Sequence, residues 1–281
     1  MSTTLGARRP SAAAWPMPPF IRASLGLHAL AAGATLALPA AWPWALGAVA
    51  LDHALITAAG LWPRSRWLGP NVQRLDAAGT ARHEIALTID DGPDPAVTPA
   101  VLDLLDAWHV RATFFCIARR ARAAPGLVRE IVARGHSVQN HSDVHRHTFS
   151  LLGPRGFQRE LRAAQETLAD LAGVRPTWFR APAGLRNPFL DPVLHRLDLR
   201  LVAWTRRGFD TAETRPERVL GKLGGALGPG DILLLHDGNA ARAAGGTPVI
   251  LEVLPALLDR LARQGLAAVT LPQACAVEGG T

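Results

Sequence analysis

Cysteine is scarce in this sequence, with Cys116 and Cys275 the only two among 281 residues. Two isolated cysteines provide neither a disulfide framework nor the ligand spacing of a cysteine-based zinc site. The sequence also has no internal repeat and no low-complexity tract, which argues against a repeat architecture. At this length we expect one barrel-type domain with a sizeable core and an accessory segment.

A long basic run is also absent, although the formal net charge is +7. The arginines are scattered along the chain and form no basic patch interleaved with aromatic residues. This distribution argues against nucleic acid as a partner. The positive balance instead suits work near anionic lipids or on phosphate-bearing substrates.

Charged residues are rare in two apolar stretches near the N-terminus, Ile21–Leu38 and Trp42–Leu61. Each stretch is close to the length of a membrane-spanning helix, and the Pro39 turn with its neighbouring tryptophans suits a tight hairpin. Asp52 and His53 lie in the middle of the second stretch, where a charge needs a partner helix or a shallow position. We therefore expect a membrane hairpin over residues 21–62, with membrane lipids as partners.

Arginines flank this hairpin on both sides, which bears on its orientation. They are Arg8, Arg9 and Arg22 before it, and Arg64, Arg66 and Arg74 after it. By the positive-inside rule both flanks lie in the cytoplasm, so a multi-pass protein of a bacterial-type inner membrane would carry its globular domain on the cytoplasmic face. If only one helix crosses, the domain lies outside, in the periplasm.

After a linker over residues 63–82, short β-prone runs alternate with helical patterns, as in a parallel sheet with crossover helices. The expected strands are Ile85–Ile89, Ala112–Ile117, Ser137–Val138, Thr177–Phe179, Leu199–Trp204, Ile232–Leu235 and Ala267–Val269. The expected helices are Ala96–Ala107, Pro125–Ala133, Gly156–Leu171, Pro188–His195, Glu217–Leu223 and Val249–Arg263. About seven strands in this order indicate an α/β barrel.

Ionisable side chains follow these strands at their carboxyl ends, where the active sites of such barrels gather. They are Asp90 and Asp91, His141 and His145, Arg180, Asp210 and His236. One site should collect all of them.

The adjacent carboxylates of Asp90 and Asp91 end an apolar strand, and buried like charges require a cation or a shared proton. Helix capping by one of them is the simpler alternative. His141 and His145 stand at i and i+4 and would share one face of a helical turn, a spacing that suits two nitrogen ligands of one ion. Together with Asp91 they leave a position open for water, as in a catalytic metal site.

Three further residues complete the candidate site. Arg180 precedes a Pro182 turn and could orient a carboxylate, although an exposed loop arginine is the ordinary alternative. His236 ends another apolar strand, and Asp210 could fix its protonation state.

Taken together, the segments TIDDGP, HSDVH, RAPAG and LLLHD and the region of Asp210 resemble the polysaccharide deacetylase, or NodB-homology, family of carbohydrate esterases. The resemblance covers residues 83–275, which become the expected catalytic domain between the linker and a tail at 276–281; residues 1–20 form an N-terminal tail. It implies a distorted (β/α) barrel after the membrane hairpin.

The resemblance also implies roles for individual residues. Asp91, His141 and His145 bind a divalent ion, usually Zn²⁺, with Co²⁺, Ni²⁺ or Mn²⁺ as other options. Asp90 acts as base and His236 as acid. Arg180 orients Asp90, Asp210 tunes His236, and the Pro182 turn presents the N–H of Ala183 to the oxyanion.

Two positions depart from the family pattern, in which a tyrosine often stands at Ala183 and a tryptophan at Thr211. Both family residues usually line the sugar groove, so a smaller or lipid-linked substrate becomes plausible.

The predicted function is metal-dependent removal of an N-acyl group, such as acetyl, from an amino sugar in a cell-surface glycan or a lipid-linked precursor. One alternative is a deformylase or deacetylase of an undecaprenyl-linked amino sugar at the cytoplasmic face. Another is a non-catalytic membrane protein that binds sugar.

Overall fold

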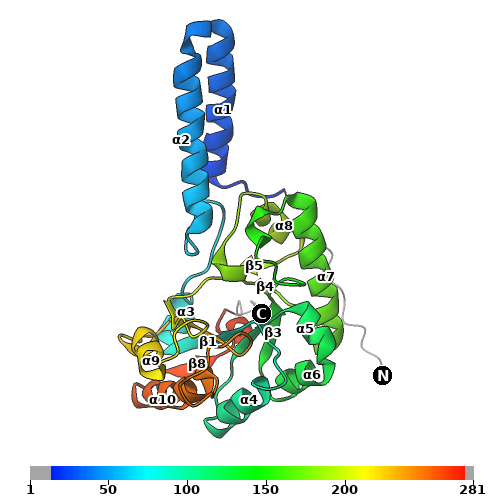
Figure 1. The fold of residues 1–281 in the computed structure, drawn as a ribbon, viewed down its shortest axis with the longest axis vertical. Helices are drawn as coiled ribbons and strands as arrows, with labels where there is room; N and C mark the ends of the chain where they lie inside the picture. Colours follow the sequence, from blue (N-terminus) through cyan, green and yellow to red (C-terminus); the bar gives the residue numbers. More distant parts are fainter. Residues whose placement is uncertain (1–13, 276–281) are drawn as a thin grey trace.

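A computed structural model describes residues 14–275 of the chain as an α/β domain from which a helical hairpin projects (Figure 1). The tail expected at 276–281 and the first thirteen residues of the tail expected at 1–20, with Arg8 and Arg9, lie outside the described residues.

The α/β domain is built on a parallel sheet that has eight strands within the described residues. The strands are β1 (Glu84–Asp90), β2 (Thr113–Cys116), β3 (Ser137–Asn140), β4 (Trp178–Phe179), β5 (Arg200–Leu201), β6 (Arg206–Arg207), β7 (Ile232–His236) and β8 (Ala267–Val269). Their order is β5-β4-β3-β2-β1-β7-β6, and β8 also pairs with β1. Strand β1 lies in the middle of the sheet, and its residues after Glu84 are buried, as is usual for strands of a parallel sheet with helices on both faces.

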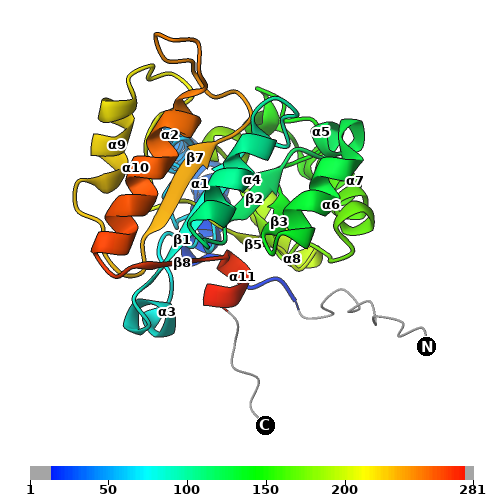
Figure 2. The same cartoon turned by 90° about the horizontal axis from the view of Figure 1, so that it is seen from below.

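Helices flank this sheet (Figure 2). They are α3 (Ala77–Ala81), α4 (Thr98–Ala107), α5 (Ala118–Ala123), α6 (Pro125–Ala133), α7 (Pro154–Ala172), α8 (Leu190–Arg196), α9 (Pro216–Gly224), α10 (Val249–Arg263) and α11 (Leu271–Ala274). The largest hydrophobic cluster joins β1, β2 and β7 to α4 and α10, with Leu87, Val101 and Leu254 fully buried in it. This packing fixes the strand ends that carry the site.

The expected barrel is confirmed as a parallel half-barrel, because the path of paired strands ends at β5 and β6 without closing. These edge strands have two residues each, and the chain between them is irregular. The single strand expected over Leu199–Trp204 is therefore wrong. Strand β6 was missed because two consecutive arginines give no apolar signal.

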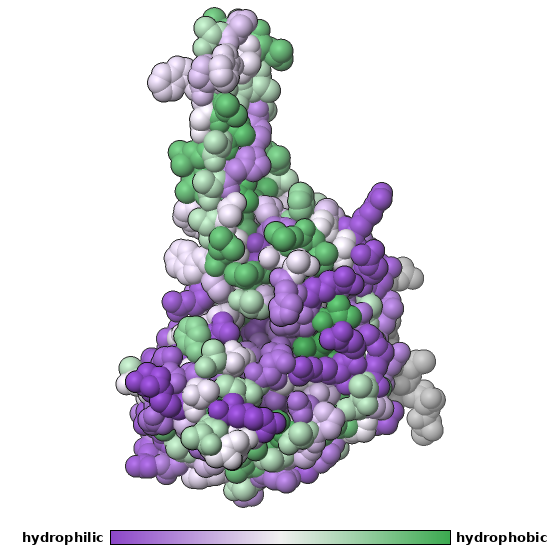
Figure 3. All heavy atoms as spheres, in the orientation of Figure 1, coloured by the Kyte–Doolittle hydropathy of each residue, from purple (hydrophilic) through white to green (hydrophobic). Residues whose placement is uncertain are grey.

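The hairpin consists of α1 (Pro19–Ala37), a short 3₁₀ turn (Pro39–Ala41) and α2 (Trp42–Leu61), close to the expected bounds. Helices of 19 and 20 residues are roughly 30 Å long, about the thickness of the hydrocarbon core of a bilayer. By length and composition both helices could cross a membrane. Their apolar side chains are largely exposed, as the surface in Figure 3 shows, so neither is a core helix of the domain.

Helix α1 supplies polar partners for Asp52 inside this apolar hairpin. Asp52 accepts a 2.6 Å hydrogen bond from Ser24 Oγ on α1 and lies 3.8 Å from His28. His28 also contacts His53 across the pair, at 3.2 Å. Asp52 and His53 of α2 thus face α1.

Candidate metal centre and acid–base pair

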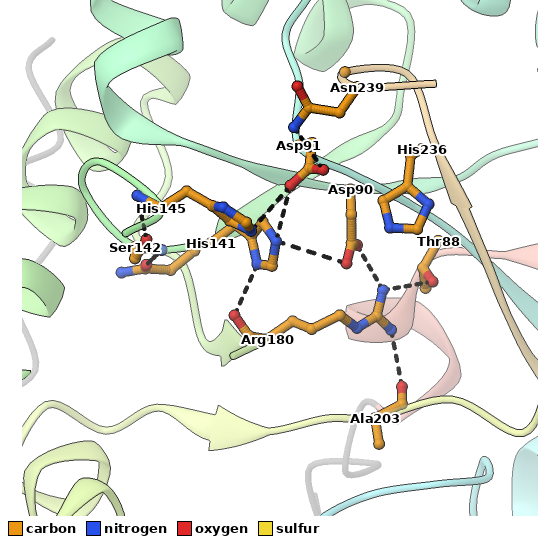
Figure 4. A network of polar contacts seen from close by, with 12 residues as sticks. Thr88, Asp90, Asp91, His141, Ser142, His145, Arg180, Ala203, His236 and Asn239 are labelled. Carbon is orange, nitrogen blue, oxygen red and sulfur yellow. Dashed lines mark hydrogen bonds and ion pairs between the residues drawn. The ribbon is translucent and has the colours of Figure 1, made fainter. Parts of the chain in front are cut away.

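The pairing of β1 with β7 brings the first two candidate residues together. Asp90, the last residue of β1, is in register with His236, the last residue of β7. Asp91 follows at a positive φ of 74°, a conformation uncommon for a non-glycine residue, and lies beside His141 and His145 in Figure 4. Asp90 and Asp91 do not cap α4, because Asp94 forms the turn that precedes that helix.

Asp91, His141 and His145 form a set that can hold a metal ion. One potential ligand atom from each lies within 4.8 Å of the others. Asp91 Oδ1 is 3.2 Å from His141 Nε2 and 3.3 Å from His145 Nε2, yet it is buried and accepts no well-aligned hydrogen bond from a described residue. Buried acceptors need a donor or a cation, so a divalent ion fits this set.

The surroundings prepare these side chains for metal binding. The Arg180 carbonyl lies 2.8 Å from His141 Nδ1 and accepts its proton, which leaves Nε2 for an ion. On the other side, Asn239 Nδ2 donates to Asp91 Oδ2 at 3.0 Å. These bonds orient two of the three candidate ligands.

Electrostatics also keep two of the candidate ligands deprotonated at neutral pH. Burial favours a neutral Asp91, but His141, followed by His236 and His145, outweighs it and holds the pKa of Asp91 below its ordinary value. Burial, with the nearby His141, lowers the pKa of His145 to about 4. Ligands must be deprotonated to bind metal, so Asp91 and His145 are in the required state. At His141 burial is outweighed by Asp90 and Asp91, which raise its pKa, so this histidine must release its proton when an ion binds.

The two histidines do not share a helical turn, which corrects the sequence expectation. Ser142 and His145 have positive φ values of 69° and 53°, and the segment is an irregular loop. Asn140 Oδ1 accepts from the Ser142 N–H, and Ser142 Oγ accepts from the His145 N–H. These side chains replace helical hydrogen bonds, and the loop still brings the two imidazoles together, with ring centroids 4.8 Å apart.

Arg180 holds Asp90 in place, as predicted. Its Nη1 donates to Asp90 Oδ1 at 2.7 Å and to Thr88 Oγ1 at 2.8 Å, and its Nη2 donates to the Ala203 carbonyl (Figure 4). The guanidinium is 1% exposed and lies over the ring of Phe115. The alternative that Arg180 is an exposed loop arginine is therefore excluded.

His236 is held by Asp210 in the same manner. Asp210 Oδ1 lies 2.9 Å from His236 Nδ1, and Oδ2 accepts from the His236 N–H at 2.7 Å. Burial disfavours the imidazolium, but Asp210, which is fully buried, outweighs this and raises the pKa of His236. His236 therefore keeps its proton to higher pH than an ordinary histidine.

The turn after Arg180 supplies a backbone donor. Pro182–Gly184 form one 3₁₀ turn, in which Ala183 adopts a positive φ of 54°. The N–H groups of Gly184 and Leu185 are used within the turn, whereas that of Ala183 donates no hydrogen bond to a described residue. Ala183 lines the pocket, where this N–H could meet an oxyanion.

A pocket of about 430 Å³ opens onto these groups. Its lining includes Asp90, Asp91, His141, His145, Ala183 and His236. Arg180, Pro182 and Asp210 are not among its lining residues, but Arg180 and Asp210 bond to Asp90 and His236, which are.

Sequence reasoning missed two contributors, Asn239 and Arg120. Arg120 donates to the Asp91 carbonyl at 2.9 Å and to Asn239 Oδ1 at 2.8 Å. Asn239 follows the same strand end as His236, so its position was a usable signal. Arg120 lies on α5, a helix that the sequence analysis did not predict.

Comparison with known proteins gives a consistent picture. A family model described as polysaccharide deacetylase matches residues 77–202. The chitooligosaccharide deacetylase of Sinorhizobium fredii is 32% identical over 208 residues, which cover 70% of this chain and 94% of that protein. A peptidoglycan-N-acetylglucosamine deacetylase of Bacillus cereus is 29% identical over 209 residues, covering 74% of this chain and 91% of that protein.

A solved structure agrees with these relatives. The family 4 carbohydrate esterase from Streptomyces lividans, in complex with acetate, has a TM-score of 0.59 and 31% identity, with 66% of this chain and 91% of that chain covered. The sequence prediction of the family is confirmed, and the chain belongs to the polysaccharide deacetylase family of carbohydrate esterases.

Proposed function

We propose that this chain is a metal-dependent hydrolase that removes the acetyl group from an N-acetylated amino sugar. One observation carries the proposal: the Asp91–His141–His145 set lines the same pocket as Asp90 and His236, whose side chains are held by Arg180 and Asp210. The relatives named as chitooligosaccharide and peptidoglycan deacetylases support the amino-sugar substrate.

The pairs Arg180–Asp90 and Asp210–His236 suit the two proton transfers of amide hydrolysis. Asp90, oriented by Arg180, would accept the proton of the attacking water. His236, kept protonated by Asp210, would donate a proton to the leaving amine. The Ala183 N–H would stabilise the negative charge that develops on the acyl oxygen.

Asp91, His141 and His145 would hold the divalent ion, for which zinc suits the two nitrogens and one carboxylate. When bound, the ion supplies Lewis-acid activation of the acyl group and of water.

The hairpin motivates a second candidate substrate, an amino sugar that is lipid-linked and carries an acetyl or formyl group. The base of the hairpin contacts the Pro182–Gly184 turn and the residues that follow it: Pro63 packs against Gly184, and the Arg186 N–H donates to the Gly60 carbonyl at 3.1 Å. Gly184 lines the pocket. If α1 and α2 span a membrane, as we propose, the pocket therefore lies close to its surface.

The test of activity uses the full chain in detergent, loaded with Zn²⁺, with chitooligosaccharide as substrate and released acetate as the readout. Loss of a general base should reduce turnover by about 10²–10⁴-fold in Asp90→Asn. Asp170→Asn, an exposed carboxylate on α7, is the matched control and should retain activity. Equal acetate release by Asp90→Asn and the natural chain would refute the assignment of Asp90 as base, and no release by either would favour a non-catalytic sugar-binding protein.

Two measurements distinguish the second candidate. Formate and acetate release from acylated polyprenyl-linked amino sugars would identify the acyl group and the lipid. A reporter fused after Thr281 would read the side of the membrane. A cytoplasmic signal is expected if both helices cross, and a periplasmic signal would refute the cytoplasmic-face enzyme.

A further inference from the structure

The pocket contains an arginine, Arg207, that the proposed reaction does not use. Arg207 lies on β6 in register with Leu234 of β7, two residues before His236. Both Arg207 and Leu234 line the pocket, together with Trp204. Its position is therefore at the wall of the pocket on the His236 side.

The neighbouring Arg206, on the same strand, has its N–H groups bonded to acceptors of the protein and therefore serves as a comparison. Arg206 donates through Nε to Asp231 Oδ2 at 2.8 Å and through Nη2 to the Ala226 carbonyl. Arg207 has no such partner: within residues 14–275 it donates no side-chain hydrogen bond and forms no ion pair with a carboxylate. Its Nε is moreover buried without an acceptor.

Aromatic rings hold this unpaired guanidinium in position. Its carbon lies 5.3 Å from the ring centroid of Trp204 and 5.0 Å from that of Phe209. Such contacts orient an arginine but do not satisfy its N–H groups. A partly buried cation without an acceptor is unfavourable, so the arrangement points to a ligand that completes it.

The other cations of the pocket are occupied or exposed. Arg120 is bonded to the Asp91 carbonyl and to Asn239. Arg119 also lines the pocket, but it is exposed to solvent. Among the described residues, Arg207 is therefore the pocket-lining arginine with a buried donor left unused.

We infer that Arg207 binds a phosphate group carried by the substrate, so that the enzyme acts on an N-acylated amino sugar bearing a phosphate or phosphodiester. The inference rests on the proposed function and names its substrate class. The planar fork of an arginine matches two phosphate oxygens, and a site that lacks a protein acceptor leaves the fork for them. The phosphate could belong to a lipid-linked sugar or to a phosphorylated glycan.

The test compares kcat/KM for the α-methyl glycoside of N-acetylglucosamine with that for N-acetylglucosamine 1-phosphate. A charge-assisted contact predicts a preference of roughly 10–100-fold for the phosphate, which should fall as salt is added. Arg207→Gln should bring the ratio close to one, and Arg207→Lys should keep part of it. Arg129→Gln, an exposed arginine on α6, is the charge-matched control and should leave the ratio unchanged.

Additional substrates identify the source of the anion. Faster deacetylation of the polyprenyl phosphodiester of N-acetylglucosamine than of its methyl phosphodiester would indicate a lipid-linked sugar. Equal rates of deacetylation would indicate a phosphorylated glycan. A preference for N-acetylmuramic acid, which carries a carboxylate, over the sugar phosphate would overturn the assignment to phosphate.

The outcomes separate this inference from the proposed function. If neither sugar is hydrolysed, the deacetylase proposal fails, and calorimetric binding of the sugar phosphate to the natural chain and to Arg207→Gln still tests the subsite. If both sugars are hydrolysed at equal kcat/KM and Arg207→Gln changes nothing, the phosphate subsite is wrong and the deacetylase stands. Should Arg207→Gln not fold, Arg207→Lys provides the comparison.

Discussion

Replacing Arg180 by methionine should destabilise the fold strongly, because it removes the cation from a buried ion pair. Asp90 is 3% exposed, and Arg180 is the arginine that pairs with it at 2.7 Å. Methionine would also remove the hydrogen bonds to Thr88 and to the Ala203 carbonyl. Removing one partner of a buried ion pair costs about 3–5 kcal/mol, chiefly because the remaining charge is left without compensation.

In a domain of this size, that cost lowers the unfolding temperature by roughly 6–20 °C. The assay is thermal and urea unfolding of the full chain in detergent at pH 7. A chelator is included, so that an ion at Asp91 and His141 does not compensate Asp90. Asp90→Asn and the double variant Arg180→Met/Asp90→Asn complete a double-mutant cycle, and the double variant should lose at least about 1 kcal/mol less than the sum of the single losses.

A loss below about 1 kcal/mol in Arg180→Met, or strictly additive losses in the cycle, would refute this reasoning. Either result would mean that water or another group compensates Asp90. The role of Arg180 in orienting the proposed base would then lose its structural basis.

Three further predictions concern other parts of the site. Asp210→Asn should lower the pKa of His236, and because the protonated form is the proposed acid, the alkaline limb of the kcat–pH profile should move to lower pH; an unmoved limb would contradict the assignment. Chelation should abolish acetate release and lower the unfolding temperature, and Zn²⁺ should restore both unless no ion binds. Gly184→Ala should lower the free energy of unfolding more than Gly173→Ala does. Both glycines have a positive φ, but only at Gly184 would the new Cβ lie 2.6 Å from Pro63, so equal losses of free energy would exclude this contact.

Sequence patterns were sufficient for the elements with strong local signals. Helices α6 and α10 and strand β8 have the expected bounds, because apolar periodicity and proline at a first turn are local properties. The paired carboxylates, the two histidines and Arg180 could be named in advance because polar residues after buried strands stand out against their surroundings. The domain boundaries expected for the tails and linker, and the catalytic roles, remain predictions.

Only the tertiary structure decided how these residues meet. Asp90 and His236 become neighbours through the pairing of β1 with β7, and nothing in either segment specifies its partner strand. The histidines converge through side-chain hydrogen bonds and positive φ values in an irregular loop, which periodicity cannot reveal. Arg207 is distinguished from Arg206 by the pocket that it lines and by the absence of an acceptor near it among the described residues. Such differences depend on contacts between distant segments, so they arise only when the chain has folded.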